Sequence, residues 1–144
     1  MSDALKVVHD GLEAFNAHDE DRIREGYAPD AVFEGPGDVR LEGPEAITGY
    51  TMSWLNAFPD ARMTIHHEAA SGDWVFVRAT FEGTHENPLP GPEGEIPPTH
   101  KHLVGRAAQA WRVAGGKIAE EHLYYDQMQV LTQLGLVPEA AATA

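Results

Sequence analysis

The chain has 144 residues, which suits one domain with a continuous core, so residues 1–144 are expected to form a single unit. Ten Lys and Arg against 23 Asp and Glu give a formal charge of −13, which disfavours nucleic acid and anionic membranes as partners. There is no cysteine, which excludes disulfides and thiol chemistry, and neither a signal-like start nor a long apolar segment, so a cytoplasmic protein is expected.

Two helices are predicted at the start of the chain. The first is amphipathic, because apolar residues recur at helical spacing at Leu5, Val8, Leu12 and Phe15. Asp19 can cap a short second helix that carries Ile23 and Tyr27 and ends near Pro29.

A hairpin and a third helix follow. Residues 31–42 are predicted to form the hairpin, around the Gly-Pro-Gly sequence at 35–37. Pro44 and Glu45 suit the first turn of a helix, which Pro59 ends. One face of this helix carries Ile47, Tyr50 and Trp54.

Beyond residue 60 the apolar residues alternate, which is typical of strands. They are Met63 and Ile65, then Val75, Val77, Ala79 and Phe81, with a turn at 72–73 between the two sets. Residues 87–100 hold five prolines and two glycines and are predicted to be a long surface loop without strand or helix. Such a loop serves either as a lid or as a plain connection, and the sequence leaves both open.

Two more strands, at 101–113 and 117–126, flank Gly115-Gly116, a dipeptide typical of two-residue hairpins. A final helix carries Met128, Leu131 and Leu134, and the tail at 139–144 is expected to be disordered. Helices first and a mostly antiparallel sheet later predict an α+β domain whose helices cover one sheet face.

Regular pairing across Gly115-Gly116 predicts which side chains of the last strand face the helices. Pairing Val113 with Ile118 and continuing without interruption to Gly105 with Asp126 places these pairs on one face. The same face receives Trp111, and also Gln109 opposite His122 and Ala107 opposite Tyr124. Because Gly105 and Ala107 are small, they leave room for a pocket.

Asp126 is the predicted acid/base residue of this pocket. Burial among apolar side chains would raise the pKa of its carboxyl group toward the range useful for proton transfer. The pattern leaves open the alternative that Asp126 caps the helix that follows.

Other candidate residues surround Asp126. His122 lies about 13 Å away along the strand, too far for direct contact, so His85 at the end of another strand is the better imidazole partner. Tyr124 is predicted to hydrogen-bond a substrate oxygen, with a core tyrosine as the alternative. Substrate contacts are expected from His122, Gln109, Trp54, Phe33, Phe81 and Phe15. His66-His67 and His100-x-His102 form no recognisable ligand set, so no metal is expected.

Several segments resemble SnoaL-like polyketide cyclases, within the nuclear transport factor 2/ketosteroid isomerase fold superfamily. The similarity covers nearly the whole chain and is carried by AFNAHD at 14–19, AFPDAR at 57–62, FEGTHENPLPGPEGEIPPTHK and GGKIAEEHLYYDQMQVLTQLGLVP. It implies a cone-shaped curved sheet around a central pocket, closed by helices, with dimers formed through the outer sheet face.

The resemblance also implies cofactor-free ring closure, with an aspartate matching Asp126 as general acid/base in an intramolecular aldol step and a looser match for His85. His100 stands where many relatives have glycine, and His122 where some have tryptophan. Both departures indicate a substrate different from that of the best-known members.

The favoured hypothesis is a cofactor-independent cyclase acting on a hydrophobic polyketide-type molecule, by aldol chemistry or by shape-directed cycloaddition. An isomerase or epoxide hydrolase, or a binding module without chemistry, are the alternatives. A homodimer is expected, because the opposite face of the last hairpin is predicted to expose an apolar set, Ala108, Ala110, Leu123 and Tyr125.

Overall fold

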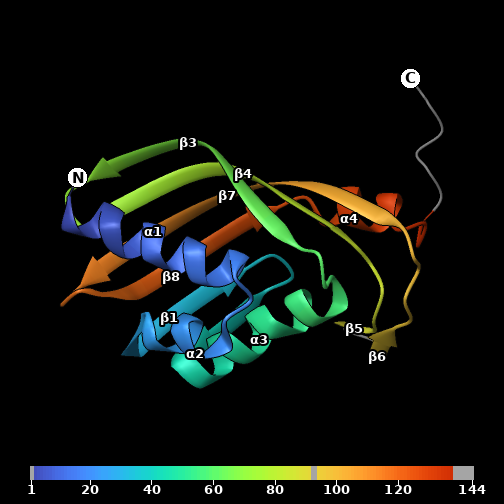
Figure 1. Cartoon of the computed structure of the whole chain (residues 1–144), viewed down its shortest axis with the longest axis horizontal. Coiled ribbons are helices and arrows are strands. Elements are labelled where there is room, and N and C mark those ends of the chain that lie inside the picture. Colours follow the sequence, from blue (N-terminus) through green and yellow to red (C-terminus); the bar gives the residue numbers. More distant parts are fainter. Residues whose placement is uncertain (1, 92–93, 138–144) are drawn as a thin grey trace.

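The computed structural model describes residues 2–91 and 94–137 and shows four helices and eight strands within them (Figure 1). The helices are α1 Asp3–Asn16, α2 Glu20–Glu25, α3 Pro44–Ala57 and α4 Gln127–Gln133. The strands are β1 Tyr27–Gly35, β2 Val39–Glu42, β3 Arg62–Ser71, β4 Trp74–Thr84, β5 Leu89–Gly91, β6 Gly94–Ile96, β7 His102–Ala114 and β8 Lys117–Tyr125. None of the helices in these ranges is long and apolar enough to cross a membrane. The tail predicted to be disordered lies outside the described residues.

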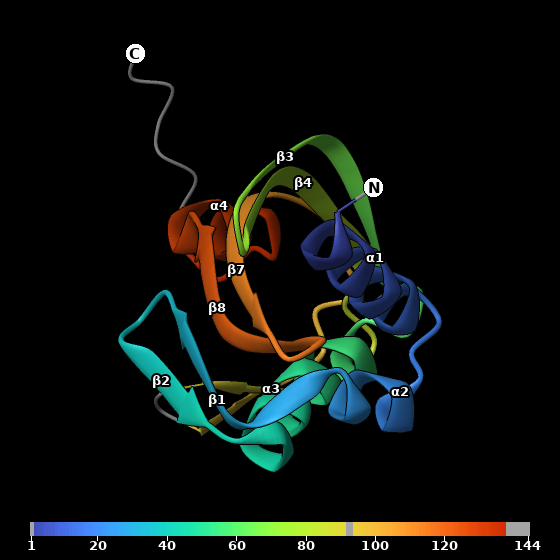
Figure 2. The ribbon, with the colours of Figure 1, turned by 90° about the vertical axis from the view of Figure 1, so that its left-hand side faces the viewer.

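Six strands form one curved sheet in the order β2-β1-β8-β7-β4-β3. Only the β1–β8 pair is parallel among the described strand pairs of this sheet. In Figure 2 the sheet curls around a central space, with α1 beside its open side and α3 across the end formed by β1. The predicted α+β class and its cone-shaped sheet are confirmed.

Local sequence signals explain the helix ends. The Ser2 hydroxyl accepts a hydrogen bond from the Leu5 N–H at the start of α1, and Asp19 caps α2 in the same way through the Arg22 N–H. Pro44 begins α3, at a position where its missing N–H has no cost. The starts of α2 and α3 agree with the predictions.

Tyr27 differs from its prediction, because α2 ends at Glu25 and Tyr27 is the first residue of β1. The neighbouring Gly26 carbonyl accepts a hydrogen bond from the Ile118 N–H, so the chain leaves the helix to pair with β8. Tyr27 is therefore a strand residue, and its side chain turns inward from the sheet.

The predicted hairpin turn at Gly115-Gly116 is confirmed. Both glycines have positive φ, +59° and +76°, which two-residue turns of this type require and which other residues adopt only with strain. The turn joins β7 and β8 and fixes the pairing of Val113 with Ile118.

The segment predicted as a loop without strands contains a small hairpin of β5 and β6, so that part of the prediction is wrong. Leu89 pairs with Ile96 and is buried against the main core. Proline-rich composition thus did not prevent two strands of three residues each, since a buried leucine secures the hairpin to α3 and its neighbours.

The Gln-Leu-Gly sequence at 133–135 fastens α4 to the sheet. Because β8 ends at Tyr125, opposite Ala107, the preceding edge of β7 has no strand beside it. Gln133 takes the place of a strand: its Oε1 accepts from the Val104 N–H at 2.8 Å and its Nε2 donates to the Val104 carbonyl at 3.0 Å. The end of α4 is thereby held beside β7.

Candidate active site

A β-bulge in β8 decides which side chains enter the interior. Val113 pairs with Ile118, but the residue before Val113, Arg112, pairs with Glu120. Ala119 is therefore an extra residue with no partner. Side chains alternate between faces, and one extra residue reverses the alternation of everything beyond it. The uninterrupted pairing predicted from the sequence is therefore wrong after the first pair.

Beyond the bulge the inward residues of β8 are Glu121, Leu123 and Tyr125. His122 and Tyr124, predicted to face the pocket, lie on the outer face. Tyr124 is 62% exposed, and His122 lies between two carboxylates, 3.3 Å from Glu34 and 3.2 Å from Glu120.

Asp126 is exposed and caps α4, so the prediction that its carboxyl group looks into the pocket is wrong. Its Oδ1 accepts hydrogen bonds from the Met128 N–H at 2.9 Å and the Gln129 N–H at 3.3 Å. The alternative left open by the sequence, a helix cap, is the arrangement observed.

His85 is completely buried but is not part of the cavity wall. Its Nδ1 accepts a hydrogen bond from the Thr99 N–H at 3.2 Å, and its ring stacks on Phe58 at 5.2 Å between centroids. Burial lowers the pKa of His85, so the neutral imidazole is favoured. His85 thus fastens Thr99 to the end of β4, and its predicted pairing with Asp126 has no geometric support.

A cavity of about 120 Å³ lies between the concave face of the sheet and helices α1 and α3. A closed cavity of similar size, roughly 150 Å³, holds benzene. Because this cavity is partly open, a larger ligand can extend out of it. The wall contains residues predicted to line it, namely Phe15, Phe33, Trp54, Phe81 and Gln109, and also the small residues Gly105 and Ala107. Trp54 packs edge-to-face on Phe81 and on Tyr125, so aromatic rings form much of this wall.

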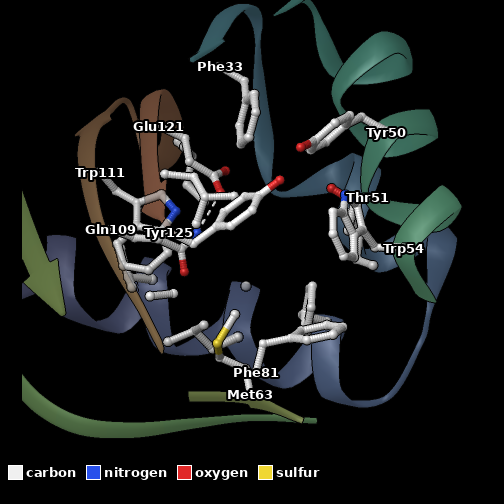
Figure 3. A pocket seen from close by; sticks show the side chains of 18 of the residues that line it. Phe33, Tyr50, Thr51, Trp54, Met63, Phe81, Gln109, Trp111, Glu121 and Tyr125 are labelled. Atoms are coloured by element: carbon white, nitrogen blue, oxygen red, sulfur yellow. Dashed lines mark hydrogen bonds between the residues drawn. The ribbon is translucent and has the colours of Figure 1, made fainter. Parts of the chain in front are cut away.

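Glu121 places a carboxyl group in this apolar wall (Figure 3). Its Oε1 accepts a hydrogen bond from the Tyr27 hydroxyl at 2.5 Å, and its Oε2 accepts one from Gln109 Nε2 at 2.9 Å. Burial raises the pKa of Glu121, although the hydrogen bonds from Tyr27, Trp111 and Gln109 oppose the rise. Among residues 2–91 and 94–137, Glu121 is the only carboxyl residue that is buried.

Two phenol groups form a second polar feature of the cavity. Tyr50 comes from α3 and Tyr125 from the end of β8, and Figure 3 shows their hydroxyl groups directed toward the same part of the cavity. Burial raises the pKa of both phenols, which keeps them neutral and able to donate a hydrogen bond.

Within residues 2–91 and 94–137, no three His, Asp or Glu side chains are grouped so that they could hold a metal ion. His66 instead contacts the Thr80 hydroxyl at 2.7 Å, and His67 accepts a hydrogen bond from Arg78 at 3.2 Å. Both histidines are occupied with neighbouring side chains of the β3–β4 pair.

The family of SnoaL-like polyketide cyclases has a sequence model that matches residues 6–134, nearly the whole chain. The chain belongs to this family. No curated protein matches the sequence.

Solved structures of other proteins share the fold. IdmH, a proposed polyketide cyclase from Streptomyces antibioticus, is 29% identical with a TM-score of 0.77, covering 92% of this chain and 98% of its own. A proposed SnoaL-like polyketide cyclase from Jannaschia sp. CCS1 is 21% identical with a TM-score of 0.83, covering 94% of each chain. An LEH-like epoxide hydrolase from M. tuberculosis, 19% identical with a TM-score of 0.71, covers 92% of this chain and 89% of its own.

One departure from the family pattern lies where the backbone conformation favours glycine. His100, which stands where the resemblance leads us to expect glycine, has a φ of +60°, in the left-handed region that glycine adopts most easily. His100 keeps this conformation while its N–H donates to the His85 carbonyl at 2.9 Å.

Sequence reasoning missed Glu121, Tyr27, Tyr50 and Tyr125 as cavity residues. The signal for the two on β8 is the pair Ile118-Ala119, two consecutive apolar residues followed by two glutamates, which breaks the alternation expected of a regular strand. The helical spacing predicts Tyr50 on one face with Ile47 and Trp54, but it does not connect Tyr50 with the pocket.

Proposed function

We propose that this family member is a cofactor-independent cyclase that closes a ring in a hydrophobic, polyketide-type molecule bound in the cavity. The observation that carries the proposal is the carboxyl group of Glu121, buried in a mostly apolar wall beside two neutral phenols. Glu121 takes the acid/base role that the sequence suggested for Asp126. Tyr50 and Tyr125 take the role predicted for Tyr124, hydrogen-bonding a substrate oxygen.

An aldol ring closure moves one proton out and one proton in. Glu121, as carboxylate, removes a proton from the carbon beside a substrate carbonyl, and that carbon attacks a second carbonyl of the same chain. The resulting alkoxide receives the proton back from Glu121, so the protein ends in its starting state. A raised pKa makes the carboxylate a stronger base, and hydrogen bonds from Tyr50 and Tyr125 stabilise the oxygen on which negative charge develops.

Replacing Glu121 with glutamine tests this role. Glu121→Gln keeps the shape and the contact with Tyr27 but cannot exchange a proton, so we expect kcat to fall by about 10²- to 10⁴-fold. The measurement is the rate at which a linear poly-β-ketone ester is converted to its cyclised product, followed by liquid chromatography and mass spectrometry.

Asp126→Asn is the matched control, because it removes a carboxylate outside the cavity and leaves a good helix cap. We expect its rate to stay within about twofold of wild type, a change of no more than about 0.4 kcal/mol in the barrier. Full turnover by Glu121→Gln would refute proton transfer and favour a cycloaddition directed by cavity shape.

Two other functions fit the cavity less well. Epoxide hydrolysis would call for a second carboxylate beside the first, and Glu121 is the only acidic residue in the described wall. A binding module without chemistry would retain a small molecule through purification, detectable by mass spectrometry, and would convert none of the candidate substrates.

We also propose a homodimer formed through the outer face of the sheet. Phe76 is 45% exposed, Val104 43% and Tyr124 62%, and all three lie on this face around the small residue Ala108. Two residues predicted there, Leu123 and Tyr125, line the cavity instead, so the apolar set differs from the predicted one.

A further inference from the structure

Gln109 carries a polar atom that the described part of the protein leaves without a partner. Its side chain comes from the middle of β7 into the cavity wall and is 8% exposed. Its Nε2 donates to Glu121, but its Oε1 is buried and accepts no hydrogen bond from the described residues. Buried amide oxygens in native proteins are nearly always paired, so this exception calls for a functional explanation.

The contact with Glu121 fixes which end of the amide is left over. If the amide were turned around, its oxygen would face a carboxylate oxygen, and two acceptors would repel each other. The Tyr27 hydroxyl is already occupied on the other carboxyl oxygen, so it offers Gln109 nothing. The amide oxygen is therefore the atom available to a ligand.

We propose that Gln109 determines substrate specificity by accepting a hydrogen bond, at Oε1, from a phenol or enol hydroxyl group at the buried end of the substrate. The inference rests on the proposed function in so far as this cavity is the substrate site. The rest of the substrate is largely apolar, because most of the surrounding wall is aromatic and aliphatic and burying polar groups there without partners is costly.

This arrangement also places the hydroxyl group beside the acid/base residue. Gln109 and Glu121 are joined by a hydrogen bond of 2.9 Å, so a group that binds one is next to the other. Poly-β-ketone chains readily form enols, and an enol held by Gln109 has its reactive carbon close to the Glu121 carboxyl group.

Three two-ring probes of similar size test the inference by calorimetry. They are 2-naphthol, which donates a hydrogen bond, 2-methoxynaphthalene, which only accepts one, and naphthalene, which does neither. We expect wild-type protein to bind 2-naphthol about five- to tenfold more tightly than either of the others. Equal affinities, or a preference for the methoxy compound, would overturn the inference.

Gln109→Met removes the amide oxygen while keeping a side chain of similar length, and we expect the preference for 2-naphthol to disappear. Thr51→Val is the matched control, since the Thr51 hydroxyl already donates to the Ile47 carbonyl, and this variant should keep the preference. A preference that survives in Gln109→Met would show that another group reads the hydroxyl.

The binding measurements and the turnover measurements test the two proposals separately. Should Gln109→Met fail to fold, as circular dichroism would show, the three probes on wild-type protein still decide the matter. An inactive protein that prefers 2-naphthol would refute the cyclase proposal and keep this one. An active cyclase without the preference would do the reverse.

Discussion

Glu121 connects the chemistry of the cavity to the stability of the fold. Burial raises its pKa, so the folded state holds this proton more tightly than the unfolded chain does. This bound proton stabilises the folded state. Its contribution is fully present below the pKa of Glu121 in the unfolded chain, about 4.3, and is lost as the pH rises through the higher pKa of Glu121 in the folded protein.

Residue 121 cannot ionise in the Glu121→Gln variant. The Tm of the variant minus the Tm of wild type should therefore increase as the pH rises from 4 toward 8. The check is the Tm of both proteins at each pH by calorimetry. Glu95→Gln, at an exposed position on β6, serves as the control and should show a much smaller pH-dependent difference. A Glu121→Gln difference that stays constant over this range would contradict a buried, proton-retaining carboxyl group.

At the scale of single residues, the sequence predicts the cavity wall better than its reactive group. Phe15, Phe33, Trp54 and Phe81 follow from apolar periodicity, which packing alone enforces. The position of a carboxyl group on β8 depends instead on one unpaired residue, Ala119. The structure therefore places Glu121 in the cavity wall, where Asp126 is predicted, and Asp126 outside the cavity.

At the scale of elements, most helices and strands are predictable because their ends carry strong local signals. Asp19, Pro44 and the Gly115-Gly116 turn fix the starts and turns within about a residue. The exceptions depend on distant partners: Tyr27 leaves its predicted helix to pair with Ile118 on β8, and the β5–β6 hairpin forms where Leu89 finds a buried site. Neither partner is visible from local sequence.

His85 is expected to stabilise the segment that carries β5 and β6. His85→Ala removes the acceptor of the Thr99 N–H and the ring that stacks on Phe58, so we expect a loss of about 2–4 kcal/mol in the free energy of unfolding. Urea denaturation measures this loss, and hydrogen exchange should become faster at the amides of Thr99 and His100.

His102→Ala is the comparison for His85→Ala. His102 is exposed and pairs with Glu82 at 2.8 Å, and exposed pairs of this kind contribute under about 1 kcal/mol. If both variants lost the same stability, the anchoring role of His85 would be wrong.

At the scale of the whole molecule, the fold follows from the chain order of the elements and from the resemblance to the family, and the structure confirms it. Association between copies is a separate property, because it depends on which side chains the outer sheet face presents. We expect wild-type protein to have the mass of a dimer by light scattering.

Phe76→Glu places a charge at an exposed aromatic position of the outer face and should convert the dimer to a monomer at micromolar concentration. Leu136→Glu is the control, because Leu136 is also exposed but follows α4 rather than lying on the sheet. A wild-type monomer, or a dimer unaffected by Phe76→Glu, would contradict the proposed interface.

The unpaired Ala119 has a consequence for how this family evolves. Loss of this one residue would exchange the side chains of β8 that face the cavity for those that face outward. A catalytic role is therefore transferred safely between relatives only after their strand pairings have been compared.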